Sequence, residues 1–255
     1  MAVLKRKAVN LNYEVTGEDG PWVSLINGYT RPGTDFRMMA RNIANSGFRV
    51  LTFDNRGAGK TEAMSAFSLE DMASDVSELW QELEIHESHV LGISMGGIIA
   101  QILSQRSPVM KSLTLISSTA SPEYLTADRA WPEHVDEIES KLSKYFDEEF
   151  YKGNKLLVNM MAKNIHKEIS GQDFLSRAEA QSQAMRGYQW DAQCPVGLPI
   201  LVIHGESDRI VSLQAAYDIK KRYPQASLVT FTGCGHLLLA ENLKGILKHT
   251  LSFWS

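Results

Sequence analysis

The sequence predicts an α/β fold, with a mostly parallel eight-stranded sheet flanked by helices and a helical segment inserted into it. Two observations favour this class. Apolar strand-like runs alternate with helix-like segments through most of the 255 residues, which is typical of parallel strands joined by helices. The alternation stops between about residues 120 and 192, where helical periodicity continues without a convincing strand. We therefore expect a core of residues 1–119 and 193–255 and a helical cap of residues 120–192.

Local composition and periodicity predict each element in turn. No helix separates the first two strands, so we expect them to form an antiparallel hairpin at the sheet edge. The predicted strands are Lys5–Leu11, Tyr13–Thr16, Trp22–Ile26, Arg49–Phe53, His89–Leu91, Ser112–Ile116, Ile200–Ile203 and Leu228–Phe231. The predicted core helices are Asp35–Ser46, Leu69–Leu83, Met95–Ser107, Leu213–Arg222 and Leu238–Phe253. Ser68 and Asp71 resemble a capping box at the start of the second helix. The predicted cap helices are Pro132–Phe150, Asn154–His166 and Phe174–Tyr188.

Composition excludes several classes of function. Hydrophobic residues make up 44% and charged residues 22% of the chain, as in ordinary globular proteins. A net charge of -4 and the lack of a basic tail argue against a nucleic-acid partner. The apolar runs are far too short for a membrane span, and the first residues lack the apolar centre of a signal peptide, so we expect a cytoplasmic protein. Cys194 and Cys234 are too few for a disulfide framework and are expected to be reduced.

The segment Gly92–Gly97, with the sequence GISMGG, carries the strongest functional signal. It lies between the apolar pair Val90 and Leu91 and a helix-like segment, and it matches Gly-x-Ser-x-Gly at a strand-to-helix turn. Such a turn holds its central residue in a strained conformation and exposes the side chain. The amides at the start of the following helix favour negative charge at the same place. Ser94 is therefore the candidate nucleophile.

A serine nucleophile needs a base to take its proton and an acid to orient that base. His236 is the best base, because it lies in the loop GCGH after a predicted strand, at the sheet edge where Ser94 is expected. His204 is the rival, although a position at the end of a strand favours packing behind the sheet. The turn GESD, which follows that strand, offers Glu206 and Asp208 as the acid. Asp208 is favoured because the chain is about to enter the next helix there.

The other histidines have weaker functional interpretations. His86 and His89 could be imagined as metal ligands with Glu84 and Glu87, but a third and fourth ligand are missing, so we interpret both histidines as solvated loop residues. Three more histidines fall on predicted helices without a partner motif and are interpreted as surface residues: His134, His166 and His249. The sequence therefore predicts no metal site and no cofactor.

The order Ser94, Asp208, His236 is that of the α/β-hydrolase superfamily, which the chain closely resembles. INGYT, at residues 26–30, resembles the family's oxyanion loop, and FDNRGAGKT, at residues 53–61, resembles its Asp-x-Arg-Gly-x-Gly turn. The resemblance covers about residues 21–119 and 196–255. It implies an esterase-like or lactonase-like serine hydrolase in which the backbone amides of Tyr29 and Met95 form the oxyanion hole. Asn27 departs from the family's usual histidine, which puts the polar network behind that loop in doubt.

The segment DNRGAGKT also resembles a phosphate-binding loop of the Walker A type. It misses that motif by one position, because Asp54 stands where the first glycine belongs and its carboxylate would repel a phosphate. The next helix is also expected to begin near Ser68 rather than at Lys60. We therefore interpret Asp54 and Arg56 as structural residues of a turn.

The predicted chemistry is hydrolysis of a carboxylic ester, lactone or thioester of a small, largely apolar substrate through an acyl-enzyme on Ser94. Three alternatives remain open: a carbon-carbon bond hydrolase, an acyl-carrier-protein methyl ester esterase, and a receptor of the same fold with slow turnover. Cap residues that could line an apolar pocket are Trp131, Phe150, Met160, Met161, Phe174, Met185 and Trp190. Four lysines approximate one helical face, for which a solvated surface is favoured over docking to an acidic carrier protein: Lys152, Lys155, Lys163 and Lys167.

Overall fold

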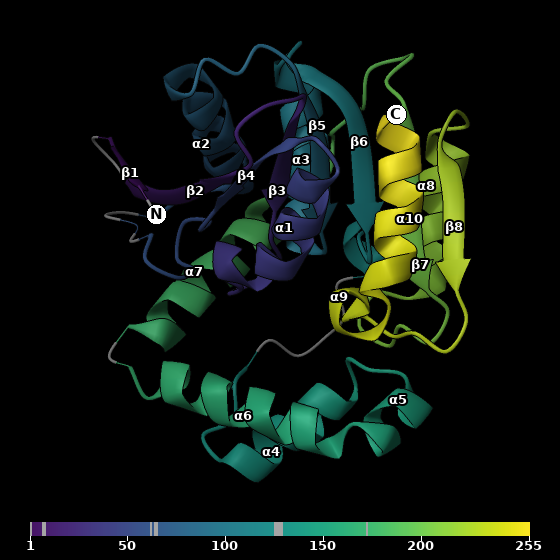
Figure 1. The fold of residues 1–255 in the computed structure, drawn as a ribbon. Helices are drawn as coiled ribbons and strands as arrows, with labels where there is room; N and C mark the ends of the chain where they lie inside the picture. The colour runs from purple at the N-terminus through teal and green to yellow at the C-terminus, as the bar shows by residue number, and fades with distance from the viewer. Residues whose placement is uncertain (1, 7–8, 62, 64–65, 125–129, 172) are drawn as a thin grey trace.

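A single twisted sheet forms the centre of the molecule (Figure 1). The structure is a computed structural model that describes residues 2–6, 9–61, 63, 66–124, 130–171 and 173–255. These residues form an eight-stranded sheet in the order β1-β2-β4-β3-β5-β6-β7-β8. The strands are β1 (Ala2–Lys5), β2 (Asn10–Thr16), β3 (Trp22–Ile26), β4 (Arg49–Phe53), β5 (Ser88–Ile93), β6 (Met110–Ile116), β7 (Ile200–Gly205) and β8 (Ser227–Phe231). The β1–β2 and β2–β4 pairs are antiparallel and the others are parallel, which confirms the predicted sheet.

Helices cover both faces of the sheet, and each face has its own apolar cluster. On one face, α2 (Leu69–Glu82), α3 (Met95–Arg106) and α8 (Leu213–Arg222) pack against the strands. On the other face lie α1 (Arg37–Asn45), the short α9 (Leu238–Glu241) and α10 (Leu243–Trp254). Burial on both faces explains why the central parallel strands are mostly apolar rather than alternating between apolar and polar residues. The predicted capping box is present, because the Ser68 hydroxyl and the Asp71 carboxylate accept each other's backbone N–H groups at the start of α2.

The chain between β6 and β7, which we call the helical insertion, adds no strand among its described residues. It contains the turn η2 (Pro122–Tyr124) and the helices α4 (Val135–Ser143), α5 (Glu148–Gly153), α6 (Lys155–Ile169) and α7 (Phe174–Gly187). In Figure 1, α4, α5 and α6 lie together beyond the carboxyl ends of β6 and β7, and α7 leads back toward the core. The insertion has an apolar cluster of its own, centred on Ile138, Phe146 and Val158. The division into core and cap at residues 120 and 192 stays a prediction.

Several predicted boundaries differ from the structure for identifiable reasons. The first strand is β1 at Ala2–Lys5 rather than Lys5–Leu11, and residues 7–8 lie outside the described part. The helix predicted over 132–150 is two helices, since the Asp147 side chain accepts two N–H groups and starts α5. The helix predicted over 238–253 breaks at Asn242, whose side chain accepts the Gly245 N–H group and starts α10. The 3-10 turn η1 (Gly33–Phe36) precedes α1.

The turn that resembles a phosphate loop is closed around Asp54. The two carboxylate oxygens of Asp54 accept the Gly33 and Lys60 N–H groups at 2.7 and 2.8 Å. Gly59 has a φ of +52°, and a Cβ there would lie 2.3 Å from the Asp54 carboxylate. Arg56 makes a buried ion pair with Asp75 of α2, with N–O distances of 2.6 and 2.7 Å. Because a carboxylate fills the turn where a phosphate would have to lie, these contacts favour the structural interpretation.

The predicted lysine face is split between two helices. Lys152 lies on α5 and pairs with Glu148 and Glu149, whereas Lys155, Lys163 and Lys167 lie exposed on α6. No helix among the described residues is long and apolar enough to cross a membrane. Both cysteines are buried and free.

Candidate active site

Ser94 lies at the sharp turn between β5 and α3. Its φ of 53° and ψ of -120° are strained for a residue with a side chain. The flanking glycines make this turn feasible: a Cβ on Gly92 would lie 2.4 Å from the Gly96 carbonyl oxygen, and one on Gly96 would lie 2.1 Å from that of Ile26. A side chain at Gly92 would push α3 away from β5, and one at Gly96 would push α3 away from β3. The turn therefore presents the Ser94 hydroxyl at the carboxyl edge of the sheet.

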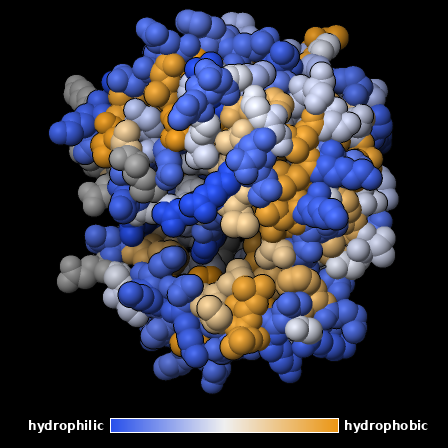
Figure 2. Space-filling model, in the orientation of Figure 1, coloured by the Kyte–Doolittle hydropathy of each residue, from blue (hydrophilic) through white to orange (hydrophobic). Residues whose placement is uncertain are grey.

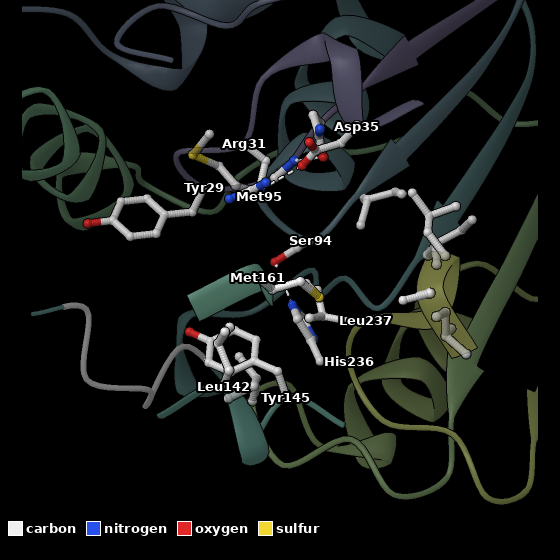
Figure 3. A pocket seen from close by; sticks show the side chains of 18 of the residues that line it. Tyr29, Arg31, Asp35, Ser94, Met95, Leu142, Tyr145, Met161, His236 and Leu237 are labelled. Carbon is white, nitrogen blue, oxygen red and sulfur yellow. Dashed lines mark hydrogen bonds and ion pairs between the residues drawn. The ribbon is translucent and has the colours of Figure 1, made fainter. Parts of the chain in front are cut away.

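The structure brings Ser94, His236 and Asp208 together. Figure 3 shows the Ser94 and His236 side chains facing each other. The three residues follow β5, β8 and β7, whose carboxyl ends meet at one edge of the sheet. His236 Nε2 lies 3.2 Å from the Ser94 hydroxyl oxygen, and His236 Nδ1 lies 2.8 Å from the Asp208 carboxylate. An ionised carboxylate only accepts hydrogen bonds, so Nδ1 carries a proton and Nε2 is left to accept one from Ser94. This is the geometry of a nucleophile, a base and an orienting acid.

Asp208 is buried and fully hydrogen-bonded. One carboxylate oxygen accepts the N–H groups of Ile210 and Val211 at 2.8 and 2.9 Å, and the other faces His236. Burial by itself raises the pKa of Asp208. The charge of His236 and hydrogen bonds from His204 and His236 outweigh burial, so the pKa of Asp208 lies well below its usual range. Asp208 therefore stays ionised at neutral pH, as an orienting acid must.

His204 and Glu206, the alternatives for the base and the acid, do not occupy those positions. His204 is fully buried behind Asp208, and its Nε2 lies 2.9 Å from the Val211 carbonyl oxygen and 3.4 Å from the Asp208 carboxylate. This agrees with the predicted packing behind the sheet. The Glu206 carboxylate is exposed and accepts the hydroxyl groups of Thr230 and Thr232, both at 2.7 Å.

The interpretation of His89 as a solvated loop residue is wrong. His89 lies in β5 and is buried against Phe48 and Trp254, with its Nδ1 2.7 Å from the Ser112 hydroxyl. Two consequences of burial are visible: Nε2 has no hydrogen-bond partner among the described residues, and the pKa of His89 is lowered to about 4. His86, by contrast, is exposed as expected.

The His236 loop is held by the helical insertion. The Tyr145 carbonyl, between α4 and α5, accepts the N–H groups of both His236 and Leu237, at 2.7 and 3.1 Å. The Glu241 carboxylate bridges the same two segments, because it accepts the Gly235 N–H group at 2.8 Å and the Asp147 N–H group at 2.7 Å. Burial raises the pKa of Glu241. The position of His236, the predicted base, therefore depends on residues that come from both the core and the insertion.

The loop predicted to supply the second oxyanion amide lies directly beside Ser94. A Cβ on Gly28 would come within 3.3 Å of the Ser94 Cβ. Asn27 stands where the family usually has a histidine, and its side chain makes two hydrogen bonds within the loop. Its oxygen accepts the Gly28 N–H group and its nitrogen donates to the Pro32 carbonyl, both at 2.8 Å. Asn55 in turn donates to the Asn27 carbonyl at 2.9 Å. The polar network behind the loop is thus present in a different form.

The second predicted amide is that of Met95, the first residue of α3. At this position an N–H group has no acceptor within its own helix and is free to bind a negative charge. Donation by the Met95 and Tyr29 amides to an oxyanion stays a prediction.

Ser94 and His236 open into a cavity of about 510 Å³ between the core and the insertion. Figure 2 shows the hollow in the surface, with hydrophobic side chains along part of its rim. Most of its lining is apolar, including Met39, Ile93, Met161, Ile165, Leu238 and Leu243. Its charged side chains pair with each other, because the Arg31 Nε lies 2.6 Å from the Asp35 carboxylate. A cavity of this size and lining suits a small, largely apolar ligand.

The predicted cap residues divide into four groups. Trp131, Met161 and Met185 line the cavity. Phe150 and Phe174 pack within the insertion, and Trp190 packs against the core. Met160 is more than half exposed. Helical periodicity identifies apolar positions on these helices. It does not show which of those positions face the cavity.

Three residues that support the site, namely Tyr145, Gln181 and Glu241, are not among those predicted from the sequence. Tyr145 acts through its backbone carbonyl, which no side-chain motif reveals. Gln181 bonds to the loop that begins at Asn27, and Glu241 to the His236 loop. Within the described part of the chain, His, Cys, Asp and Glu side chains form no group of three that could hold a metal ion.

The fold and this site define an α/β-hydrolase. A family model described as serine aminopeptidase, S33, matches residues 21–242, and the chain belongs to this family of α/β-hydrolases. The identification made from the sequence motifs is thereby confirmed.

Individual relatives are similar to the chain at low identity. A 3-oxoadipate enol-lactonase from Acinetobacter baylyi is 24% identical over 83% of this chain and 80% of its own. A putative non-heme bromoperoxidase from Mycobacterium tuberculosis is 23% identical over 97% of this chain and 98% of its own. The solved structure of a meta-cleavage product hydrolase from Pseudomonas fluorescens superimposes with a TM-score of 0.83 at 21% identity, covering 96% of this chain and 94% of that one. At these identities, the structural likeness shows the fold.

Proposed function

We propose that the protein hydrolyses a carboxylic ester, lactone or thioester through an acyl-enzyme on Ser94. The observation that carries this proposal is the hydrogen-bonded chain Ser94–His236–Asp208 at the floor of an apolar cavity. His236 takes the hydroxyl proton as the Ser94 oxygen attacks the carbonyl carbon, and it returns that proton to the leaving group. Water, activated by the same nitrogen, then releases the acid.

The oxyanion formed in each step needs donors close to Ser94. In this proposal the amides of Met95 and Tyr29 donate to it, one from the start of α3 and one from the loop beside Gly28. Each such donor contributes about 3 kcal/mol to lowering the barrier. The position of Gly28 against Ser94 and the Asn27 bonds within the loop support a preformed hole.

The cavity supports a small, largely apolar substrate. Arg31 and Asp35 neutralise each other, so the lining presents two paired charges among mostly apolar side chains. The same triad also suits carbon-carbon bond hydrolysis. The similarity to a meta-cleavage product hydrolase keeps that reaction as the second candidate.

A panel of p-nitrophenyl esters of rising chain length tests the proposal. We expect rapid hydrolysis by the wild type and a loss of about 10⁴-fold or more in Ser94→Ala. Ser252→Ala, at an exposed position of α10, is the matched control and should retain full activity. A fluorophosphonate should label the wild type and not Ser94→Ala.

Each other outcome has a definite meaning. Failure of the wild type to be labelled would remove Ser94 as the nucleophile. Tight binding of esters without turnover would favour a receptor over an enzyme. Slow ester cleavage together with fast cleavage of a β-diketone would favour the carbon-carbon bond hydrolase.

A further inference from the structure

A charged pair, Arg31 and Asp35, interrupts the mostly apolar lining of the cavity. Both residues line the same cavity as Ser94 and His236. Figure 3 shows the two side chains lying together on the cavity wall, on the opposite side of Ser94 from His236 in this view. A ligand that reaches Ser94 therefore shares the cavity with a guanidinium group that belongs neither to the triad nor to the predicted oxyanion hole.

The Arg31 guanidinium uses only part of its hydrogen-bonding capacity. An arginine side chain carries five N–H groups, and the Nε–H group of Arg31 donates to the Asp35 carboxylate at 2.6 Å. Nη1 lies 3.9 Å from the Glu168 carboxylate of α6, which is longer than a hydrogen bond. Among the described residues, neither terminal nitrogen of Arg31 has a hydrogen-bond partner. The two terminal nitrogens therefore keep donors for a ligand.

The backbone and the head group of Arg31 are both held in place. The Arg31 N–H group donates to the Gly28 carbonyl at 3.2 Å, and the carbonyl of the following Pro32 accepts the Asn27 side chain at 2.8 Å. The guanidinium is fixed by Asp35, whose own N–H group donates to the Pro32 carbonyl at 3.1 Å. A donor that is fixed before a ligand arrives loses little conformational freedom on binding.

The charges around Arg31 favour a neutral acceptor over an anionic one. The charges of Arg31 and Asp35 cancel, and Glu168 adds a further carboxyl group, so the three side chains carry no surplus positive charge. A carboxylate on a ligand would meet repulsion from the acidic groups as well as attraction to Arg31. A carbonyl or ether oxygen accepts the same N–H groups without that repulsion.

A purely apolar ligand would leave the Arg31 donors unpaired. The Arg31 side chain is 31% exposed, so water reaches its terminal nitrogens while the cavity is open. An apolar group lying against them would displace that water and offer no acceptor in return. A site with such donors discriminates against the substrate analogue that lacks the matching oxygen.

We propose that Arg31 is a specificity-determining residue: its terminal nitrogens donate to a neutral oxygen that the substrate carries in addition to its scissile ester. The substrate class is then an ester, lactone or thioester with a keto or ether oxygen in an otherwise apolar chain. This inference rests on the proposed function, since it assumes that such a substrate is hydrolysed at Ser94.

The test compares esters of equal length that differ at one group. On the acyl side these are p-nitrophenyl hexanoate, p-nitrophenyl 5-oxohexanoate and mono-p-nitrophenyl glutarate, which carry a methylene, a keto group and a carboxylate at the fifth carbon. On the alcohol side they are pentyl butyrate and 4-oxopentyl butyrate. In at least one series we expect kcat/KM of the keto ester to exceed that of the alkyl ester by about 10- to 100-fold.

The preference should arise mainly in KM, because the hydrogen bond is made in the bound ester and in the transition state alike. After subtraction of the uncatalysed rates, the glutarate should be a poorer substrate than the 5-oxohexanoate. Asp35→Asn removes one of the repelling charges and should raise kcat/KM for the glutarate by about tenfold.

Arg31→Met keeps an apolar stem and removes the donors. It should bring the ratio of kcat/KM for keto over alkyl ester to within about threefold of one. Because this variant leaves Asp35 without its partner, Arg31→Met combined with Asp35→Asn, which keeps the charge balance, should give the same ratio. Arg37→Met is the matched control and should keep the wild-type ratio, since Arg37 is exposed at the start of α1 and does not line the cavity.

Four results would overturn the inference. They are a wild type without the keto preference in either series, a preference that survives in the double variant, a glutarate that reacts faster than the 5-oxohexanoate, and a fall in kcat that is equal for keto and alkyl esters. The last result would mean that Arg31 supports the loop beside Ser94 rather than the substrate. Circular dichroism checks that each variant is folded.

A binding experiment separates this inference from the proposed function. A wild type that hydrolyses none of these esters contradicts the proposed function. Calorimetry on Ser94→Ala then measures the affinities for methyl 5-oxohexanoate and methyl hexanoate without turnover. We expect the keto ester to bind about tenfold more tightly or better, and Arg31→Met in the same background to remove the difference. Equal affinities in Ser94→Ala would overturn the role of Arg31.

Discussion

The core and the helical insertion contribute to the candidate site in different ways. The predicted reacting side chains, Ser94, Asp208 and His236, all come from loops at the carboxyl ends of core strands. The insertion contributes a backbone carbonyl from Tyr145, the Gln181 side chain and part of the apolar lining. The type of chemistry is therefore a property of the core, whereas alignment of the site and the fit of the substrate depend on the insertion. Four predictions test this division.

Asp208→Asn should lower kcat by about 10⁴-fold, because an amide can no longer hold the His236 ring in the tautomer that accepts the Ser94 proton. The fold should be retained, since the side chain keeps its shape. Steady-state kinetics with a p-nitrophenyl ester and a circular dichroism spectrum measure both. Glu206→Gln, an exposed carboxylate in the same turn, is the control. Equal losses in the two variants would remove Asp208 from the site.

Acid should destabilise the core through His89, at the opposite end of β5 from Ser94. Burial lowers its pKa to about 4, whereas an unfolded histidine titrates near about 6.5, so the unfolded state binds the proton more readily. Stability present above about pH 6.5 is lost as the pH falls toward 4, by on the order of 3 kcal/mol. Urea unfolding followed by tryptophan fluorescence measures this.

The variant His89→Gln should flatten that pH dependence, and His86→Gln, at an exposed position nearby, should leave it unchanged. If the stability of His89→Gln still fell with pH as in the wild type, another group would be responsible for the pH dependence.

Gly235→Ala should disturb the contact between core and insertion. A Cβ at this position would lie 2.7 Å from backbone atoms of Tyr145 and Phe146, so the His236 loop and the insertion must move apart. We expect a loss of about 2 kcal/mol in stability, a Tm lower by about 4–8 °C, and reduced kcat. Gly187→Ala, at the end of α7, meets nothing within 4 Å and is the control. An unchanged Tm and kcat in Gly235→Ala would show that the contact is not maintained in solution.

The smallest effect concerns substrate choice. Met161 of α6 lines the cavity, so Met161→Ala should enlarge it and shift the preferred p-nitrophenyl ester toward longer acyl chains. We expect the ratio of kcat/KM for octanoate over butyrate to rise by about tenfold or less. Met160→Ala, the exposed neighbour, should leave the ratio unchanged. A shift in both variants would mean that the selectivity does not arise in this cavity.

Much of the core could be predicted from the sequence because its signals are local. Strands buried on both faces are mostly apolar, and the Gly-x-Ser-x-Gly turn needs its glycines within a few residues of Ser94. The order of Ser94, Asp208 and His236 along the chain then identified a triad whose members the structure brings within hydrogen-bond distance. Their catalytic role awaits the experiments above.

The supports of the site could not be predicted in the same way. Gln181 reaches Thr30 across 151 positions, and a buried glutamine on a helix looks like any other polar residue in sequence. Tyr145 uses a carbonyl that every residue has. His89 was interpreted as a solvated loop residue, although the strand predicted over His89–Leu91 begins with it and β5 begins one residue earlier. Tertiary packing decides the roles of Gln181 and Tyr145, and the local sequence does not record it.

The glycine contacts around Ser94 limit which substitutions the protein tolerates. Neither Gly92 nor Gly96 has room for a single methyl group, so almost any substitution there displaces α3. On α6, by contrast, Met161 borders an open cavity where side chains of other sizes fit. Single substitutions in the insertion can therefore admit new substrates, whereas substitutions in the turn that carries Ser94 are not tolerated.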